Sequence, residues 1–271
     1  MKKSILIITI ILALAALCAC TEDGAQAYVP PATDTPPVSS ETDDISSAPA
    51  PDDTDGNSGG ADAAPPPDTA VTPDPMDSAQ PKEPQVVICI DPGHGGKDSG
   101  AEWNGRIEKD DTLALALKVA QQVEELGHIA LLTRNDDSYP YFSERAETAN
   151  NANADLFISL HRNSFVGAQG VEIWISYQAN TTTEEFAENM LEAIAEVGIT
   201  KNRGVKKGTV SSSTEDYYVN KLTDMPSCII ELGFITSDED NRLYDENMDA
   251  YAKAIAEQAV KEALYIKEEA K

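Results

Sequence analysis

The chain has 271 residues, with 47 acidic against 20 basic side chains and a formal net charge of −27 at pH 7. Such acidity disfavours nucleic acid and anionic lipid headgroups as binding partners. The acidic excess lies in two parts, since residues 21–84 hold 14 acidic residues and one lysine, while residues 85–271 hold 33 acidic and 17 basic ones.

The first segment has the features of an export signal. Lys2 and Lys3 precede an apolar run at residues 5–17, which is too short to span a bilayer and ends in small residues. Leu17-Cys18-Ala19-Cys20 resembles the lipobox of bacterial lipoproteins, and that resemblance implies cleavage before Cys20 and lipid on its thiol. An ordinary signal peptide with an incidental cysteine is the alternative. We predict a signal peptide at residues 1–19 and attachment to a membrane through Cys20.

Residues 20–84 are of low complexity, being rich in Pro, Asp, Thr, Ser, Ala and Gly, with few large apolar residues. Such a segment cannot bury enough apolar surface to offset the entropy of ordering it. Its prolines and like charges favour an extended chain. We therefore predict a disordered linker between the lipid site and a folded domain.

Hydrophobic periodicity predicts alternating strands and helices over residues 85–271. Residues 201–224 are polar and suggest loops with short strands, and Asp238 could open a short helix. The expected strands are 86–90, 128–133, 155–160, 170–176 and 227–231, and the expected helices are 108–126, 143–153, 181–197 and 250–266. This alternation predicts a single α/β domain with a mostly parallel twisted sheet and helices on both faces.

Two cysteines, Cys89 and Cys228, lie inside apolar runs of this domain. We interpret them as buried free thiols that pack as small hydrophobes, with a disulfide as the alternative. They lack the C-x-x-C spacing of a redox protein.

Two of the three histidines directly follow predicted buried strands. His94 lies in a glycine turn, Asp91-Pro92-Gly93-His94-Gly95-Gly96, and His161 follows the strand at 155–160. The carboxyl ends of parallel strands share one edge of a sheet, where open α/β sheets bind ligands, so these imidazoles can converge. His128 begins a strand and is expected at the opposite edge, in a structural or surface role.

Glu231 and Glu108 are the candidate carboxylates. Glu231 ends an apolar strand, where an unpaired carboxylate is costly to bury, so it is either held structurally or faces a cleft. Glu108 opens a predicted helix, where complementing the helix dipole would alone explain it. Two imidazoles and a carboxylate would form a catalytic type of zinc site, and a further carboxylate would supply a general base. A compact H-E-x-x-H motif is absent from the sequence.

Seven collinear motifs give the domain a family resemblance. They are DPGHGGKDSGA (91–101), EKD (108–110), LLTR (131–134), SERAETAN (143–150), ADLFISLHRNS (154–164), GVE (170–172) and IIELGFIT (229–236). The domain resembles the zinc-dependent N-acetylmuramoyl-L-alanine amidases of the amidase_3 type, which are cell-wall hydrolases. Two positions depart from the family pattern: Arg162 stands where a small residue is common, and Ile235-Thr236-Ser237 replaces a common asparagine.

The resemblance implies a role for each candidate residue. His94, Glu108 and His161 would bind one zinc ion, and Glu231 would be the catalytic base. The substrate would be peptidoglycan, cut between N-acetylmuramic acid and L-alanine of the stem peptide, by an exported domain facing the cell wall. The alternatives are a zinc peptidase acting elsewhere in the stem peptide and a non-catalytic wall-binding lipoprotein. No protein activator is indicated.

We predict that three further residues contact the substrate or the groups around the metal ligands. They are Asn163, Arg134 and Glu172.

Overall fold

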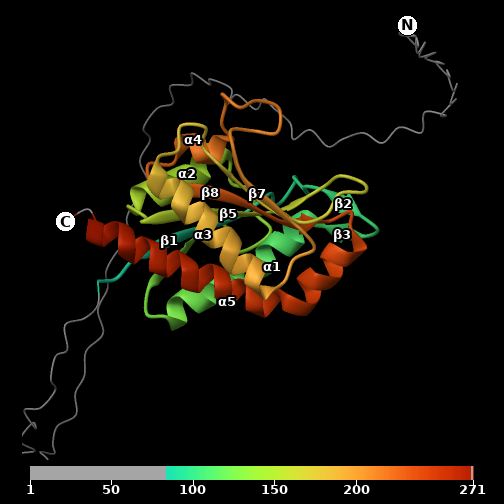
Figure 1. Cartoon of the computed structure of the whole chain (residues 1–271), viewed down its shortest axis with the longest axis horizontal. Helices are drawn as coiled ribbons and strands as arrows, with labels where there is room; N and C mark the ends of the chain where they lie inside the picture. Colours follow the sequence, from blue (N-terminus) through green and yellow to red (C-terminus); the bar gives the residue numbers. More distant parts are fainter. Residues whose placement is uncertain (1–83, 270) are drawn as a thin grey trace, which may run out of the picture.

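The computed structural model describes residues 84–269 and 271 (Figure 1). The predicted signal peptide, the predicted lipid site at Cys20 and all but the last residue of the predicted linker lie outside this range. In the described part, no helix is long and apolar enough to cross a membrane.

A six-stranded sheet with the order β4-β1-β5-β8-β6-β7 forms the centre of the domain. β4, β1, β5 and β8 are parallel to one another, β6 is antiparallel to β8, and β7 is parallel to β6. The predicted mostly parallel sheet is confirmed. The strands are β1 (Val87–Pro92), β4 (Ile129–Leu132), β5 (Leu156–Asn163), β6 (Val171–Ile175), β7 (Asn202–Lys207) and β8 (Ser227–Phe234).

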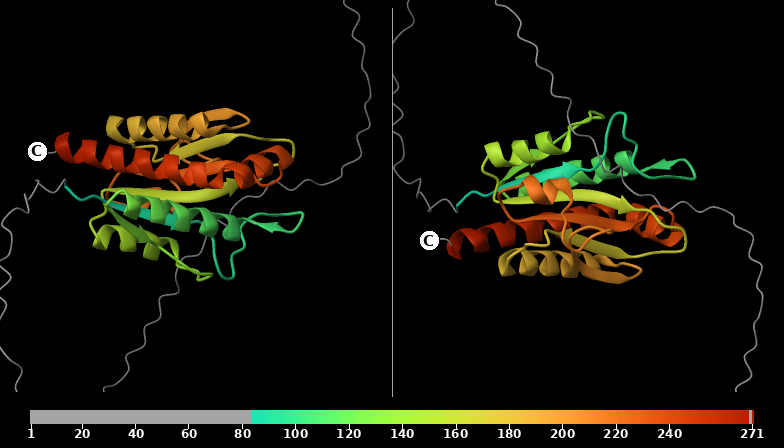
Figure 2. Two further views of the ribbon diagram at one scale, coloured as in Figure 1. Left: turned by 90° about the horizontal axis from the view of Figure 1, so that it is seen from below. Right: turned by 90° about the horizontal axis from the view of Figure 1, so that it is seen from above.

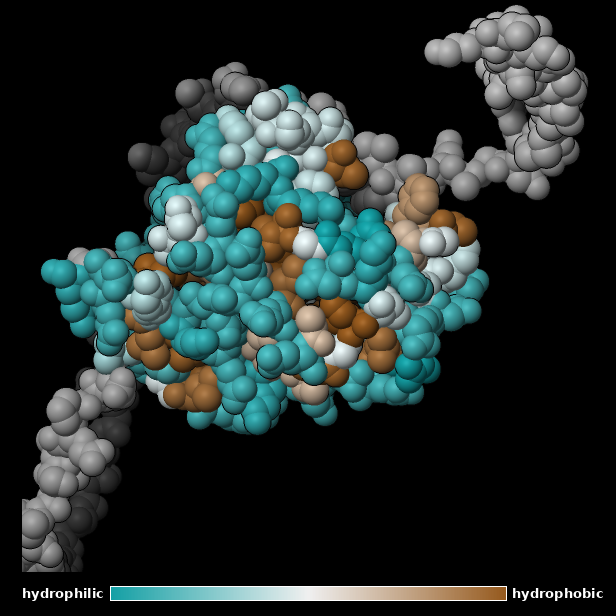
Figure 3. All heavy atoms as spheres, in the orientation of Figure 1, coloured by the Kyte–Doolittle hydropathy of each residue, from teal (hydrophilic) through white to brown (hydrophobic). Residues whose placement is uncertain are grey.

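Helices cover both faces of the sheet (Figure 2). Side chains alternate along each strand, so Ile88, Ile158 and Ile230 join a core with α1, α3 and α5, while Cys89 and Phe157 pack on the other face with α2 and α4. The solvent side of α3 and α5 is largely hydrophilic (Figure 3). The helices are α1 (Glu108–Glu125), α2 (Phe142–Asn151), α3 (Thr181–Val197), α4 (Tyr218–Leu222) and α5 (Asp238–Glu269).

Two elements differ from the sequence prediction. α5 is one helix of 32 residues where a short helix and a separate final helix were expected. Arg242 forms ion pairs with Glu239 and Glu246 across the stretch between them, at the i, i+3 and i, i+4 spacings that support a continuous helix. The hairpin of β2 (Glu102–Trp103) and β3 (Arg106–Ile107) was not predicted.

Both cysteines of the domain are buried free thiols, as predicted. Cys89 belongs to the core on the α2 and α4 side, and Cys228 to the core on the opposite side of the sheet. β5 separates the strands that carry them. A disulfide between these two residues is therefore excluded by the fold.

The two edges of the sheet have different surroundings. β1, β5 and β8 all end at the edge where the predicted site residues lie. At the other edge the start of the domain meets the end of α5, where Lys267 Nζ donates to the main-chain oxygen of Gln85 at 2.9 Å. The polypeptide chain therefore enters the domain at the sheet edge opposite to the predicted site residues.

Candidate metal and catalytic site

His94, Glu108 and His161 converge at the carboxyl edge of the sheet. One ligand atom from each lies within 4.8 Å of the others. Glu108 Oε1 is 3.1 Å from His94 Nε2 and 3.0 Å from His161 Nδ1, and the two imidazole rings meet edge to face with centroids 4.8 Å apart. The turn after β1, the start of α1 and β5 thus each contribute one side chain, although the residues are far apart in sequence.

Glycines provide the room in which these side chains meet. A Cβ on Gly93 would lie 2.4 Å from His161 Nε2, and one on Gly100 would lie 2.7 Å from Glu108 Oε2. His94 itself has a positive φ of 60°, an uncommon backbone conformation that directs its ring toward Glu108. Gly93 in the glycine turn and Gly100 just after it are therefore positions of close approach for His161 and Glu108.

Hydrogen bonds fix the orientation of Glu108. The Ala101 N–H donates to Oε2 at 2.8 Å, and the Arg162 N–H donates to Oε1 at 3.0 Å. Burial raises the pKa of the Glu108 carboxyl, but the charge of His94 and hydrogen bonds from both histidines outweigh it and hold the pKa far below its usual range. Glu108 is therefore an ionised carboxylate.

Asp98 is a residue that sequence reasoning missed. Its Oδ2 lies 2.9 Å from His94 Nδ1, on the side of the ring away from Glu108. Burial lowers the pKa of His94, but the Glu108 carboxylate and Asp98 together raise it to about 10. A carboxylate behind an imidazole orients the ring and raises its basicity as a metal ligand. The signal was an aspartate four residues after the histidine.

Glu231 lies beside these residues with no hydrogen-bond partner for one of its oxygens. It pairs with His161 in the register of β5 and β8, and its Oε2 is fully buried and unbonded. Burial and the nearby carboxylates of Glu108 and Glu172 raise the pKa of Glu231 well above its usual value. Unpaired buried carboxylates are rare, so this one is placed to receive a proton or a ligand.

Glu172 has the opposite environment, although it faces Glu231 across the strands. It is 4% exposed and accepts hydrogen bonds from Asn163 Nδ2 (3.1 Å), Trp174 Nε1 (3.0 Å) and Arg203 Nε (2.7 Å). The three predicted substrate residues therefore do not lie together. Asn163 and Glu172 contact each other near Glu231, whereas Arg134 lies behind the turn after β1.

Arg134 is buried behind the turn that carries His94. Its guanidinium donates to the main-chain oxygens of Pro92 (3.0 Å) and Gly93 (2.8 Å), among other acceptors. These bonds hold the main chain on either side of the β1 end, and a substrate contact of Arg134 stays a prediction. His128 accepts from the Val86 N–H at 3.4 Å at the start of β4, at the opposite edge, as predicted.

The residues present fit a metal ion. The donors are two imidazoles and one carboxylate, and the absence of a Cβ on Gly93 and Gly100 lets them come close together. This donor set matches that of catalytic zinc sites, which keep a fourth position for water. A carboxylate with a free oxygen stands beside them. The arrangement can therefore support hydrolysis assisted by a metal and a general base.

Comparison with known proteins identifies the class. Residues 88–262 match the model of the Amidase_3 family, described as N-acetylmuramoyl-L-alanine amidase. The fold is that of an N-acetylmuramoyl-L-alanine amidase from Clostridium difficile 630 (TM-score 0.58, 30% identity, 68% of this chain and 97% of that one). AmiC2 of Nostoc punctiforme is similar as well (TM-score 0.59, 34% identity, 69% of this chain and 99% of that one).

The chain belongs to the Amidase_3 family and is an enzyme of the N-acetylmuramoyl-L-alanine amidase class. Among its relatives, LytC of Bacillus subtilis strain 168 is 37% identical over 158 residues, which cover 57% of this chain and 30% of LytC. YqiI of the same organism is 38% identical over 165 residues, which cover 60% of this chain and 76% of YqiI.

Proposed function

We propose that this protein is a zinc-dependent peptidoglycan amidase that cuts the bond between N-acetylmuramic acid and L-alanine of the stem peptide. The observation that carries the proposal is the convergence of His94, Glu108 and His161 beside the unbonded carboxylate oxygen of Glu231. The family supports the same reaction.

His94, Glu108 and His161 would hold the ion, with Asp98 orienting the ring of His94. When bound, zinc polarises the amide carbonyl and lowers the pKa of water. Glu231 takes the proton from the attacking water and returns it to the nitrogen of the leaving L-alanine. The buried position of Glu231 between two carboxylates favours proton uptake, and its free Oε2 can accept that proton.

The base assignment is tested by Glu231→Gln in the full chain. We expect hydrolysis of peptidoglycan to fall by about 10²- to 10⁴-fold, the usual contribution of general acid–base catalysis, while zinc stays bound at one equivalent. Dye release from labelled sacculi and metal analysis give the two readouts.

Glu262→Gln is the matched control for that variant, since Glu262 is a buried glutamate that lies on α5 and accepts hydrogen bonds from Asn189 and Gln258. It should retain full activity. Undiminished hydrolysis by Glu231→Gln would refute the role of Glu231.

The bond that is cut separates this proposal from a zinc peptidase acting elsewhere in the stem peptide, because the metal chemistry is the same for both. Mass spectrometry of the digest should find released peptides that begin with free L-alanine and sugar strands of unchanged length. Peptides that begin at a later residue would identify a peptidase. Intact peptidoglycan that merely binds the protein would identify a non-catalytic wall-binding protein.

We further propose that the protein is exported and held at a membrane by lipid on Cys20. The support is the sequence Leu17-Cys18-Ala19-Cys20 after an apolar run. Metabolic labelling with a fatty-acid probe should mark the wild-type protein and not Cys20→Ala.

A further inference from the structure

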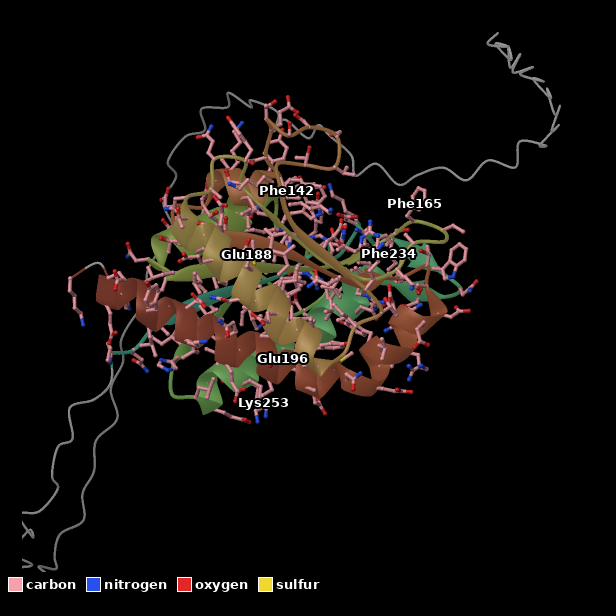
Figure 4. All side chains as sticks on the ribbon, viewed as in Figure 1. Phe142, Phe165, Glu188, Glu196, Phe234 and Lys253 are labelled. Carbon is pink, nitrogen blue, oxygen red and sulfur yellow. The ribbon has the colours of Figure 1, made fainter. Side chains whose placement is uncertain are left out.

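Four aromatic side chains near the site form two ring pairs, Tyr139–Tyr141 and Phe142–Tyr218, which are joined in the chain at Tyr141 and Phe142 and are together called the aromatic wall here. The rings of Tyr139 and Tyr141 meet edge to face at 5.5 Å, and those of Phe142 and Tyr218 stack at 5.6 Å with an interplanar angle of 12°. Tyr141, Phe142 and Tyr218 are 49%, 41% and 49% exposed. The wall spans α2 and α4, which contact each other, and Figure 4 labels Phe142 on this side of the sheet.

One end of the aromatic wall is attached to the turn that carries His94. Arg145 on α2 donates to the main-chain oxygen of His94 at 2.8 Å and to that of Pro140, within the wall segment, at 3.0 Å. Lys97, three residues after His94, places its ammonium 4.7 Å from the centre of the Tyr139 ring. The wall therefore begins next to the metal ligands.

The other end of the wall lies one residue from Tyr217, which packs toward the carboxylates of the site. Tyr217, the neighbour of Tyr218, packs edge to face on Trp174 at 5.7 Å, and Trp174 donates to Glu172. Glu172 in turn faces Glu231 across the strands. The aromatic wall thus borders the site from the His94 turn to the side of the proposed base.

Tyr141, Phe142 and Tyr218 are exposed and do not belong to either hydrophobic core cluster, so packing of the core does not account for them. Clustered apolar surface that stays in contact with water usually marks a binding site. Flat rings with phenol groups at their edges match a ligand that has apolar flat faces and a hydroxylated rim, since tyrosine combines an apolar body with a polar tip. Pyranose rings are such ligands.

Charge favours the sugar part of the substrate over its peptide part. The exposed carboxylates of Asp136 and Glu144 lie next to the wall in the chain, while Asp137 is paired with Lys109 and the Lys97 ammonium lies over the Tyr139 and Tyr141 rings. The two carboxylates that are not ion-paired in the described part of the chain outnumber the one cation and would repel the carboxylates of a stem peptide, whereas the rings of the sugar strand carry no charge. We propose that the aromatic wall is the subsite for the glycan strand, with pyranose rings stacked on Tyr141 and on the Phe142–Tyr218 pair. This inference rests on the proposed function, because it names the part of that substrate which the wall holds.

The test measures binding of uncharged sugar strands, namely β-1,4-linked N-acetylglucosamine oligomers, which carry neither stem peptides nor free lactyl carboxylates, using the full chain. These strands contain no bond for the enzyme to cut, so binding is read without hydrolysis. Tyr141→Ala and Tyr218→Ala should each weaken binding by about 2- to 10-fold, the range expected for one aromatic stacking contact. The KM for intact peptidoglycan should rise by a similar factor with kcat unchanged.

Two further variants control for folding and for non-specific stickiness. Tyr141→Phe keeps the stacking face and removes only the phenol oxygen, so it should lose less affinity for sugar strands than Tyr141→Ala. Tyr265→Ala removes a tyrosine that is 50% exposed on α5, outside the wall, and should change nothing.

The outcomes separate this inference from the proposed function. Wall variants that bind sugar strands like the wild type while hydrolysis continues would overturn the glycan subsite and leave the amidase standing. Loss of affinity for free stem peptide alone, with sugar binding intact, would overturn it too. A wild type that binds sugar strands through the wall yet does not hydrolyse peptidoglycan would support the subsite and refute the amidase.

Discussion

Gly100 and Gly105 share a left-handed backbone conformation, with φ of 67° and 83°, but have different surroundings. A Cβ on Gly100 would lie 2.6 Å from His94 Cδ2, whereas one on Gly105 would have no atom within 4 Å. Both positions are strained by any other residue. Of these two positions, only Gly100 is one where an added Cβ would also collide with a proposed metal ligand, His94.

Gly100→Ala therefore tests whether close approach at this turn sets metal affinity. We expect zinc affinity to fall by about 10- to 100-fold, as for loss of groups that orient metal ligands. Competition with a chromogenic chelator measures this. Gly105→Ala carries the same backbone strain without the collision and should bind zinc normally, and equal losses in both variants would contradict the explanation.

At the scale of elements, a buried ion pair fixes α2 to the end of β1. Asp91 accepts from Arg145 Nη1 at 2.8 Å and from Ser159 Oγ at 2.7 Å. Burial raises the pKa of the Asp91 carboxyl, but the charge of Arg145 and hydrogen bonds from Ser159 and Thr133 outweigh it and hold the pKa below its usual range. The strand that leads to His94 is thereby held to α2 and β5.

Asp91→Asn should lower the free energy of unfolding by about 3–5 kcal/mol, because it leaves the buried Arg145 charge unpaired. Urea unfolding at pH 7 measures the loss. The folded-state pKa of Asp91 lies below the unfolded value of about 3.9, so its contribution is present above that pH and is lost as the pH falls through the folded pKa. The difference between variant and wild type should accordingly shrink in acid.

Asp245→Asn is the control for this change. Asp245 pairs with Arg106 on the surface and is 61% exposed. Exposed pairs contribute about 0–1 kcal/mol. A similar loss in both variants would show that burial of the Asp91 pair is not what matters.

Sequence reasoning succeeded where periodicity and chain order carry the information. Strand ends in a parallel sheet share one edge, so His94, His161 and Glu231 could be placed together before their distances were known. The hairpin at Asn104-Gly105 was overlooked although both residues have positive φ, as a type I′ turn requires and an Asn-Gly pair predicts.

Other features of the site depend on packing that a sequence does not encode locally. The contact between Phe142 and Tyr218 joins α2 to α4, and the burial of Arg162 depends on its stacking 4.1 Å above the Tyr244 ring. These pairs are 76 and 82 residues apart. Arg162, which departs from the family pattern, thus turns its guanidinium into the core and offers only its main-chain N–H to Glu108.

At the scale of the whole molecule, the proposed metal site connects side chains from three elements that are distant in the sequence: the turn after β1, the start of α1 and the end of β5. A ligand that binds only the folded state stabilises it, by about 2.7 kcal/mol at 100 times its Kd. For a domain of this size that corresponds to a rise in Tm of about 5–10 °C.

Treatment with a chelator should therefore lower the Tm by that amount, and added zinc should restore it. Differential scanning calorimetry on the full chain measures the shift. His94→Ala should show a low Tm that neither chelator nor zinc changes. If the chelator leaves the Tm of the wild type unchanged, no bound ion stabilises the contact between these elements.

The contact of Gln85 with the end of α5 places the start of the folded domain far from the candidate metal site. α5 runs from the site edge, just after β8, back to the edge where the chain enters, and its 32 residues give it a length of about 48 Å. The candidate metal site therefore lies most of the length of α5 away from Gln85, so the residues that precede Gln85 join the domain at a place remote from the site.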